Sequence, residues 1–207
     1  DFIRVNIDLT KYIIEFIEKN NLKIRIIFSS STQADLNNIY GLSKLKAEEL
    51  LSKYAKKTNN QVFIYRLNGI FGKWSKPNYN SVVATFCYNS INNIELEVHD
   101  KDKLIKLMYI DDLVSEFMTH LNIEIDNPHM NDIVTYDISL GNLALKIKNF
   151  ANDKSIVDLN DSLTKKLLST YQSYKNPKDL SYKLKENIDE RGSFTELINT
   201  KHSGQIS

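Results

Sequence analysis

The sequence predicts an α/β fold built on parallel strands, and three observations carry this prediction. Residues 24–28 and 62–65 are short, continuous apolar runs, which are typical of strands covered on both faces of a parallel sheet. Residues 6–19 and 40–57 have apolar side chains at helical spacing. These segments alternate as helix, strand, helix, strand, an order that indicates βαβ units.

Local signals define the ends of the first strand and of the helix that follows it. The strand is expected to stop at three consecutive serines, residues 29–31. Asn37 and Asn38 precede the helix, and asparagine is a preferred N-cap because its side-chain oxygen accepts a hydrogen bond from a free backbone N–H. We therefore expect the helix to begin near Tyr40.

Beyond Arg66 the pattern becomes mixed. A loop rich in Gly, Lys, Asn and Pro is expected over residues 68–80. The further elements expected are helices over residues 80–91, 112–121, 140–151 and 161–173, short strands among residues 96–108, a linker over residues 122–131 and a strand over residues 133–138. Asp111 or Asp112 is expected to cap the second of these helices.

The overall composition suits a globular chain of one to two domains. The 207 residues are 42% hydrophobic, and 27 basic and 26 acidic side chains leave a net charge of +1. We therefore expect no nucleic-acid partner and no membrane partner. Neither a signal peptide nor an apolar stretch long enough to span a bilayer is evident. The single cysteine, Cys87, is expected to be a buried structural thiol in a reducing, cytoplasmic location.

The pair Tyr40 and Lys44 is the most informative chemical feature. The two residues are four apart near a helix start, so their side chains share one face. A lysine ammonium close to a phenol favours the phenolate, which makes the tyrosine usable as an acid or base. A serine at the end of the preceding strand lies at the edge where open α/β sheets bind ligands. Such a trio suits hydride transfer, in which a cofactor carries the electrons and the protein handles the proton.

The tyrosine–lysine pair and the histidines also have interpretations that involve no catalysis. A tyrosine four residues before a lysine also occurs by chance, as a core tyrosine with the lysine reaching past it to solvent. The serines at the strand end and the strand after the helix favour the catalytic interpretation. Four histidines lack the spacing of metal ligands, so no metal site is predicted. They are His99, His120, His129 and His202.

Ile-Ile-Phe-Ser-Ser-Ser at residues 26–31 and Tyr-Gly-Leu-Ser-Lys at residues 40–44 resemble the extended short-chain dehydrogenase/reductase family of nucleotide-sugar epimerases, dehydratases and reductases. Asn6 matches an asparagine of that family. Arg-Leu-Asn-Gly-Ile-Phe-Gly at residues 66–72 is similar to its loop beside the nicotinamide, and Tyr-Ile-Asp-Asp-Leu-Val at residues 109–114 to a later strand-to-helix junction. The resemblance implies the C-terminal part of a Rossmann-like doubly wound parallel sheet with a small α+β substrate-binding subdomain.

Phe-Gly-Lys-Trp-Ser-Lys-Pro-Asn-Tyr-Asn-Ser-Val at residues 71–82 most closely resembles one subgroup, the bifunctional capsular-polysaccharide enzymes of UDP-N-acetyl-L-fucosamine synthesis. In that subgroup a reductase domain is fused to a C-terminal cupin domain. Residues 189–196 of this chain resemble the first residues of that cupin domain. The implied organisation is a catalytic core lacking its first strands over residues 1–121, with substrate-loop insertions near residues 73–108, a substrate-binding subdomain over residues 122–185, and the start of a truncated cupin-like domain over residues 186–207.

The resemblance also implies roles for individual residues. Catalysis would fall to Ser31, Tyr40 and Lys44, with Ser31 contacting the substrate and Tyr40 donating the proton. The cofactor would contact Ser29, Tyr40, Lys44, Leu67 and Asn68. The sugar nucleotide would contact Ser31, Gln33, Lys73, Asn78 and Asn80. The alternative for the loop that carries Lys73, Asn78 and Asn80 is an exposed turn without a ligand.

Two departures from the family bear on activity. The chain contains no Gly-x-x-Gly-x-x-Gly turn of the kind that meets a dinucleotide pyrophosphate. It begins about where the family's fourth helix would be and stops inside the cupin. We therefore expect a chain truncated at both ends that binds NADP or NAD, with NADPH favoured, only weakly by itself. The sequence leaves open whether the chain is an enzyme by itself or a truncated or split-gene remnant without independent catalysis. A homodimer and a complementing N-terminal fragment are both possible partners.

The reaction is narrowed by residues 31–33, which are Ser-Thr-Gln where the family's dehydratases carry an Asp-Glu pair. Dehydration is therefore disfavoured, whereas epimerases share the serine–tyrosine–lysine trio and stay open. The loop over residues 73–80 favours reduction of the C4 ketone of a UDP-linked 4-keto-6-deoxy-N-acetylhexosamine. A binding module that retains only affinity for the sugar nucleotide is a third alternative.

Overall fold

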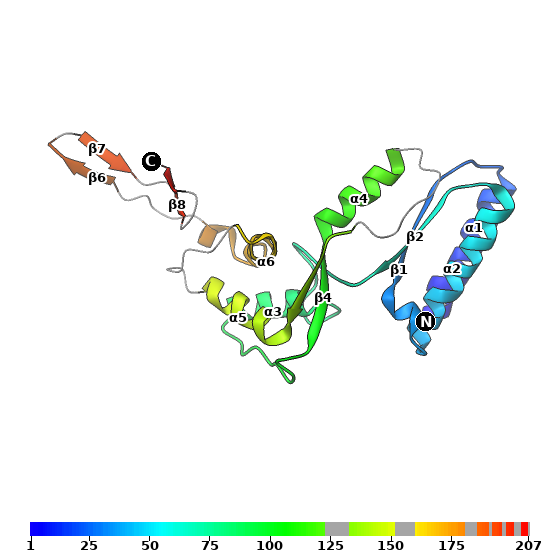
Figure 1. The fold of residues 1–207 in the computed structure, drawn as a ribbon, viewed down its shortest axis with the longest axis horizontal. Coiled ribbons are helices and arrows are strands. Elements are labelled where there is room, and N and C mark those ends of the chain that lie inside the picture. The colour runs from blue at the N-terminus through cyan, green and yellow to red at the C-terminus, as the bar shows by residue number, and fades with distance from the viewer. Residues whose placement is uncertain are drawn as a thin grey trace. The chain divides into compact units, whose positions relative to one another are not determined.

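The computed structural model describes residues 1–122, 133–151, 160–180, 186–190, 192–195, 198–200 and 204–206. The chain divides into two compact units, residues 1–68 with 111–134 and residues 69–110 with 135–207. The first unit contains a π-helical segment at Ile3–Asp8, α1 (Leu9–Lys19), β1 (Ile26–Ser31), a 3-10 turn at Thr32–Asp35, α2 (Ile39–Thr58), β2 (Val62–Leu67) and nearly all of α4 (Ile110–Asn122) (Figure 1).

The sheet of the first unit is the parallel pair β1 and β2, joined through α2, as the βαβ prediction requires. The register runs from Ile26 opposite Val62 to Ser31 opposite Leu67. The prediction that the first strand stops before its serines was wrong. Because β2 continues to Leu67, the backbone groups of all three serines find hydrogen-bonding partners within the ladder.

The first helix begins earlier than residue 6. The π-helical segment Ile3–Asp8 runs directly into α1. Its one buried residue is Asn6, whose side-chain amide donates to the Ser43 hydroxyl at 2.9 Å. Thr10 donates its hydroxyl to the Asn6 carbonyl at 2.6 Å. Widened helical turns of this kind occur often at functional sites, and this one joins the first helix to α2.

The helix α4 packs on the sheet of the first unit through His120. This side chain is buried, its ring centroid lies 4.9 Å from that of Phe63, and its Nδ1 contacts the Tyr65 hydroxyl. Burial, with a smaller contribution from Glu116, raises the pKa of Tyr65 to about 12. Arg25 donates to the carbonyls at the helix end, which satisfies acceptors that the helix leaves unpaired.

The start of α4 differs from the prediction. The helix begins at Ile110, so Asp111 and Asp112 lie in its first turn and neither precedes it as a cap. Carboxylates in a first turn are favourable because the exposed N–H groups there carry partial positive charge. The two aspartates therefore indicated the right place for the helix start, but they stabilise it through the charge of the first turn and not as an N-cap.

The second unit is built on a three-stranded mixed sheet. Its elements are β3 (Gly69–Phe71), α3 (Val82–Ile91), β4 (Leu104–Tyr109), β5 (Thr135–Ser139), α5 (Leu140–Ala151), α6 (Ser162–Gln172), a 3-10 turn at Pro177–Leu180, β6 (Glu186–Asp189), β7 (Gly192–Thr195), β8 (Ile198–Thr200) and β9 (Gly204–Ile206). The central strand β4 pairs in parallel with β3 and antiparallel with β5. The pairs β6–β7 and β8–β9 are antiparallel hairpins.

Some predicted elements in this unit are confirmed and others are wrong. The helix over residues 140–151 is observed with those bounds. The expected loop after Arg66 instead begins with β3, and residues 96–103 form no strand. Most of the predicted linker, residues 123–131, lies outside the described residues. The division into catalytic, substrate-binding and cupin-like domains stays a prediction.

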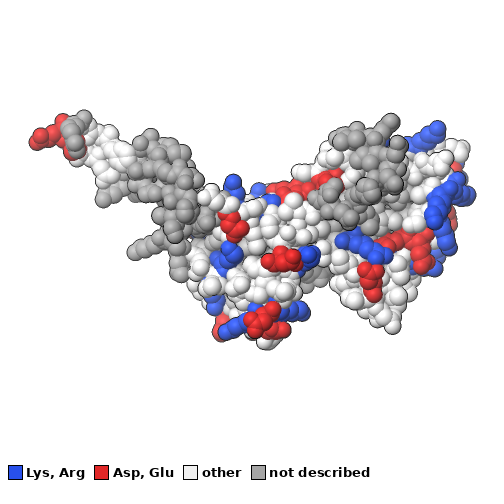
Figure 2. Space-filling model, viewed as in Figure 1, with Lys and Arg blue, Asp and Glu red and all other residues white. Residues whose placement is uncertain are grey.

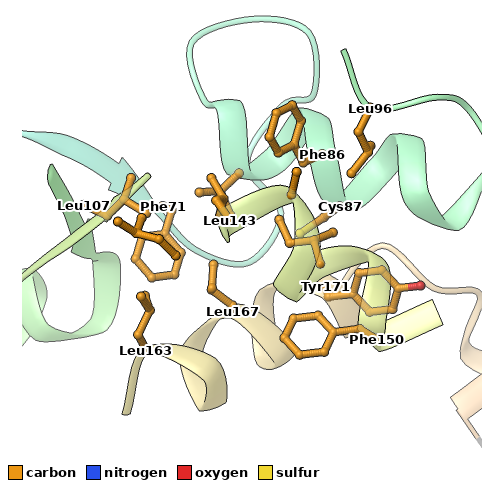
Figure 3. Close-up of a cluster of buried hydrophobic side chains, with 14 of the residues drawn as sticks. Phe71, Phe86, Cys87, Leu96, Leu107, Leu143, Phe150, Leu163, Leu167 and Tyr171 are labelled. Carbon is orange, nitrogen blue, oxygen red and sulfur yellow. The ribbon is translucent and has the colours of Figure 1, made fainter. Parts of the chain in front are cut away.

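The core of the second unit joins the sheet to α3, α5 and α6. Phe71 from β3 lies among Leu143, Leu163 and Leu167 from the helices, and Figure 3 shows these side chains pointing toward one another. Cys87 is fully buried in the same cluster, and burial raises the pKa of its thiol to about 12. The prediction of a structural thiol is confirmed, because such a group stays protonated near neutral pH.

The face of the molecule drawn in Figure 2 carries both basic and acidic side chains, which are interspersed. No helix among the described residues is long and apolar enough to cross a membrane. Within the same residues, no three His, Cys, Asp or Glu side chains gather as metal ligands would. His129 and His202 lie outside the described part of the chain.

Candidate active site

The end of β1 and the start of α2 bring Ser29, Tyr40 and Lys44 together. The Lys44 ammonium donates to the Ser29 carbonyl at 2.9 Å. The same nitrogen lies 5.9 Å from the Tyr40 ring centroid and 5.0 Å from that of Phe28. A cation at these distances is attracted to the aromatic rings, and partial burial lowers its pKa from the ordinary lysine value.

The first turn of α2 is held by caps and by a side-chain relay. Asn38, one of the two predicted caps, accepts a hydrogen bond from the Gly41 N–H at 2.8 Å. The Ser43 hydroxyl donates to the Tyr40 carbonyl at 2.7 Å and accepts from Asn6. The backbone that carries Tyr40 is therefore fixed both to its own helix and to the preceding one.

The Tyr40 side chain is half-buried beside Phe2. The two ring centroids are 5.2 Å apart in an edge-to-face arrangement, a geometry that is favourable between aromatic rings. Phe2 was missed in the sequence because it stands outside every motif and outside the predicted helix. Only the position of the π-helical segment brings it to the tyrosine.

Ser31 closes β1 and begins the following turn. Its hydroxyl oxygen accepts a hydrogen bond from the Gln33 N–H at 3.1 Å, and its side chain is largely buried. Accepting this bond leaves the hydroxyl hydrogen available as a donor. The Gln33 side chain lies in the exposed part of the same turn, so these two predicted substrate contacts are neighbours.

The predicted cofactor contacts Leu67 and Asn68 lie where β2 ends. Leu67 is buried and pairs with Ser31 across the ladder, and its carbonyl accepts from the Thr32 hydroxyl at 3.4 Å. Asn68 follows directly and is half-buried. The carboxyl ends of β1 and β2 therefore lie side by side, as ligand sites of parallel sheets require.

The three remaining predicted contacts, Lys73, Asn78 and Asn80, belong to the second unit and are exposed. Their loop is attached at three backbone points. Trp74 donates its N–H to Ser173 at 3.3 Å, Ser75 accepts from the Tyr174 hydroxyl at 2.5 Å, and Asn78 donates its N–H to Thr85 at 2.9 Å.

Two residues of this loop adopt a left-handed backbone. Trp74 has φ 62° and Asn78 has φ 54°, a region that side chains other than glycine enter at a cost. Trp74 and Tyr79 nevertheless remain 81% and 73% exposed. The loop therefore has an attached backbone and exposed aromatic side chains, and its contact with a sugar nucleotide stays a prediction.

Sequence reasoning missed a polar network that runs from the buried Ser30 and Glu48 through the half-buried Arg66 to the exposed Asp35. Glu48 was identifiable in principle, because it is a carboxylate four residues after Lys44 on the same face of the helix. Nothing in the sequence indicated its partners, because they lie on other elements.

Comparisons with known proteins identify the family of the chain. The signature of the NAD dependent epimerase/dehydratase family matches residues 1–133. The UDP-2-acetamido-2,6-beta-L-arabino-hexul-4-ose reductase of Pseudomonas aeruginosa is 38% identical over 206 residues, which are 98% of this chain and 55% of that protein. The capsular polysaccharide assembling protein CapF of Staphylococcus aureus is 40% identical in a solved structure, with a TM-score of 0.79 over 95% of this chain and 56% of that one.

A more distant structure shares the fold alone. The UDP-glucose 4-epimerase of Thermotoga maritima is 18% identical, with a TM-score of 0.70 over 86% of this chain and 71% of that one. The predicted α/β, Rossmann-like class is thereby confirmed. The chain belongs to the NAD-dependent epimerase/dehydratase family. It spans about half the length of the reductase and of CapF.

Proposed function

We propose that the protein containing this chain reduces the C4 ketone of a UDP-linked 4-keto-6-deoxy-N-acetylhexosamine for a surface polysaccharide. The observation that carries the proposal is the Lys44 ammonium, which donates to the Ser29 carbonyl at the end of the parallel pair and lies 5.9 Å from the Tyr40 ring centroid. The similarity to a UDP-sugar 4-ketose reductase over nearly the whole chain supports the choice of substrate.

In this mechanism the chain handles the proton and the orientation of the ketone. Ser31 donates a hydrogen bond from its hydroxyl to the ketone oxygen, and Tyr40 transfers its phenolic proton to that oxygen. The Lys44 ammonium stabilises the phenolate that remains. When bound, the nicotinamide supplies the hydride that reaches the ketone carbon, so the C=O bond becomes C–OH.

The residues at the strand ends fit the nicotinamide half of a dinucleotide. The exposed side chain of Ser29, the half-buried Asn68 and the donors of Lys44 would hold that half, with Leu67 beside it. Such groups suit ribose hydroxyls and a carboxamide. NADPH is our proposed cofactor, and a cytoplasmic homodimer, with or without a complementing N-terminal segment, is our proposed working form.

The 207 residues by themselves are expected to bind NADPH weakly, with a dissociation constant above about 1 mM. The six glycines of the chain form no Gly-x-x-Gly-x-x-Gly turn, and the pyrophosphate therefore lacks the backbone donors of such a turn. Titration of cofactor fluorescence with the purified chain measures the affinity. Micromolar binding would show that the residues described above suffice, and would remove this expectation.

A UDP-sugar is expected to change the fluorescence of Trp74, which is the single tryptophan of the chain and is 81% exposed. The loop presents two aromatic rings and two lysines, a combination suited to a base and a diphosphate. Titration of the chain with UDP-N-acetylglucosamine should quench or shift the emission. N-acetylglucosamine alone should not, and Lys73→Ala should weaken the response several-fold. An unchanged emission at saturating nucleotide sugar would leave this loop as a solvated turn.

Epimerisation is the second candidate, because the family to which the chain belongs includes epimerases that use the same serine, tyrosine and lysine. The two reactions differ in their use of the cofactor. A reductase consumes one reduced cofactor for each sugar converted, whereas an epimerase returns the hydride and consumes none. Stoichiometric loss of cofactor absorbance with the 4-keto sugar therefore identifies reduction.

A further inference from the structure

Ser30 points away from the predicted ligand edge and into the protein. Successive side chains of a strand alternate between its two faces, so Ser30 faces opposite to Ser29 and Ser31. It is only 4% exposed, and its hydroxyl donates to the carboxylate of Glu48 on α2. The Ser30 hydroxyl therefore binds to α2, the helix that carries Tyr40, and not to a ligand at the sheet edge.

Glu48 is itself buried, and it pairs with Arg66 from the neighbouring strand β2. The Arg66 Nε lies 3.0 Å and 3.1 Å from the two carboxylate oxygens, and its Nη2 lies 2.7 Å from the second. Two parallel N–H donors on one carboxylate fix its direction as well as its distance. The hydrogen bonds to Glu48 raise the pKa of Arg66 further above its ordinary value.

Arg66 also reaches the turn after β1. Its Nη1 donates to the Asp35 carboxylate at 2.5 Å. Asp35 ends the turn that begins after Ser31 and contains Gln33. One buried carboxylate therefore connects the strand of the serines, the helix of the tyrosine and lysine, the strand that ends at Leu67, and, through Arg66, the turn of Gln33.

The position of Glu48 on its helix matters for the reaction. Tyr40, Lys44 and Glu48 are spaced four residues apart, so they follow one another along one face of α2. Sliding or rotating the helix would move all three together. Charge-assisted bonds from two strands to Glu48 oppose both movements directly.

We propose that Glu48 is a positioning residue, which sets Tyr40 and Lys44 against the ends of β1 and β2 through its bonds to Ser30 and Arg66. Its kinetic consequence rests on the proposed reduction. A buried ion pair adds little to stability compared with apolar packing, but it requires one specific geometry. Displacing a catalytic group by an ångström can lower a rate by about 10²-fold.

The neighbouring carboxylate offers a matched control. Glu49 is exposed and pairs with Lys46 at 2.8 Å on the surface of the same helix. In the full-length protein, Glu48→Gln should lower kcat about 10- to 100-fold, while Glu49→Gln changes neither kcat nor KM for the cofactor. Ser30→Ala, which keeps the Glu48–Arg66 pair, should lower kcat less. Rates are taken at a temperature where circular dichroism shows each variant folded.

A purely structural role would lower the unfolding temperature of Glu48→Gln and leave kcat of the folded variant unchanged, and that result would overturn the proposal. If Glu48→Gln does not fold, Ser30→Ala decides, because it removes one hydroxyl and no charge. An unchanged kcat in folded Ser30→Ala would then overturn the proposal.

A second readout does not depend on the reaction. With 3-fluorotyrosine at position 40, the ¹⁹F resonance should shift or broaden in Glu48→Gln and in Ser30→Ala but not in Glu49→Gln. Superimposable spectra for all variants would overturn the positioning role. If the unmodified protein reduces no 4-keto sugar, the proposed function fails while this spectroscopic test still decides the role of Glu48.

Discussion

Tyr40→Phe is expected to lower ketone reduction by the full-length protein about 10²- to 10⁴-fold, the usual contribution of a positioned general acid. The substitution removes the phenolic proton donor and keeps the aromatic ring. The edge-to-face contact with Phe2 and the cation beside the ring are therefore retained. Cofactor affinity should stay within about twofold because Lys44, Ser29 and the end of β2 are untouched.

The measurement pairs steady-state loss of cofactor absorbance with a fluorescence titration of the cofactor. Tyr12→Phe is a suitable control, because Tyr12 is 65% exposed on α1 and lies outside the candidate site. It should leave both quantities unchanged. Near-normal turnover of Tyr40→Phe would mean that another group donates the proton and that the acid has been misassigned.

Gly41→Ala is expected to destabilise the first unit by about 3 kcal/mol, at the upper end of the cost of overpacking. The glycine has an ordinary helical backbone, so the reason is space and not conformational freedom. An added Cβ would overlap the Gln33 carbonyl oxygen and lie 2.8 Å from that of Leu36. Both are backbone atoms of the turn after β1, which would have to move away from the helix.

Such a movement would displace Gln33 and the start of α2 together, so kcat should fall along with stability. Urea unfolding followed by circular dichroism measures the loss in stability. Lys53→Ala, at an exposed position in the same helix, serves as the control and should change little. Equal stabilities of Gly41→Ala and the unmodified protein would indicate that the turn can shift without cost.

Local patterns predicted much of the fold because the interactions behind them are local. The Asn38 cap, the bounds of α5 and the Tyr40–Lys44 spacing all depend on residues within a turn or two of one another. The roles assigned to Ser31, Gln33 and Asn68 by resemblance remain predictions. The structure places these residues at one edge of the parallel pair, as a shared ligand site requires.

The sequence by itself determined the α/β class, the helix that carries Tyr40 and Lys44, and the buried thiol. Only the tertiary structure decided that β1 continues through its serines, that β5 runs antiparallel, and that Ser30 turns inward to Glu48. The physical reason is the distance along the sequence between hydrogen-bonding partners. Helix caps and helical faces satisfy their own groups nearby, whereas a strand end or a buried carboxylate is stable only when a distant segment supplies its hydrogen bonds.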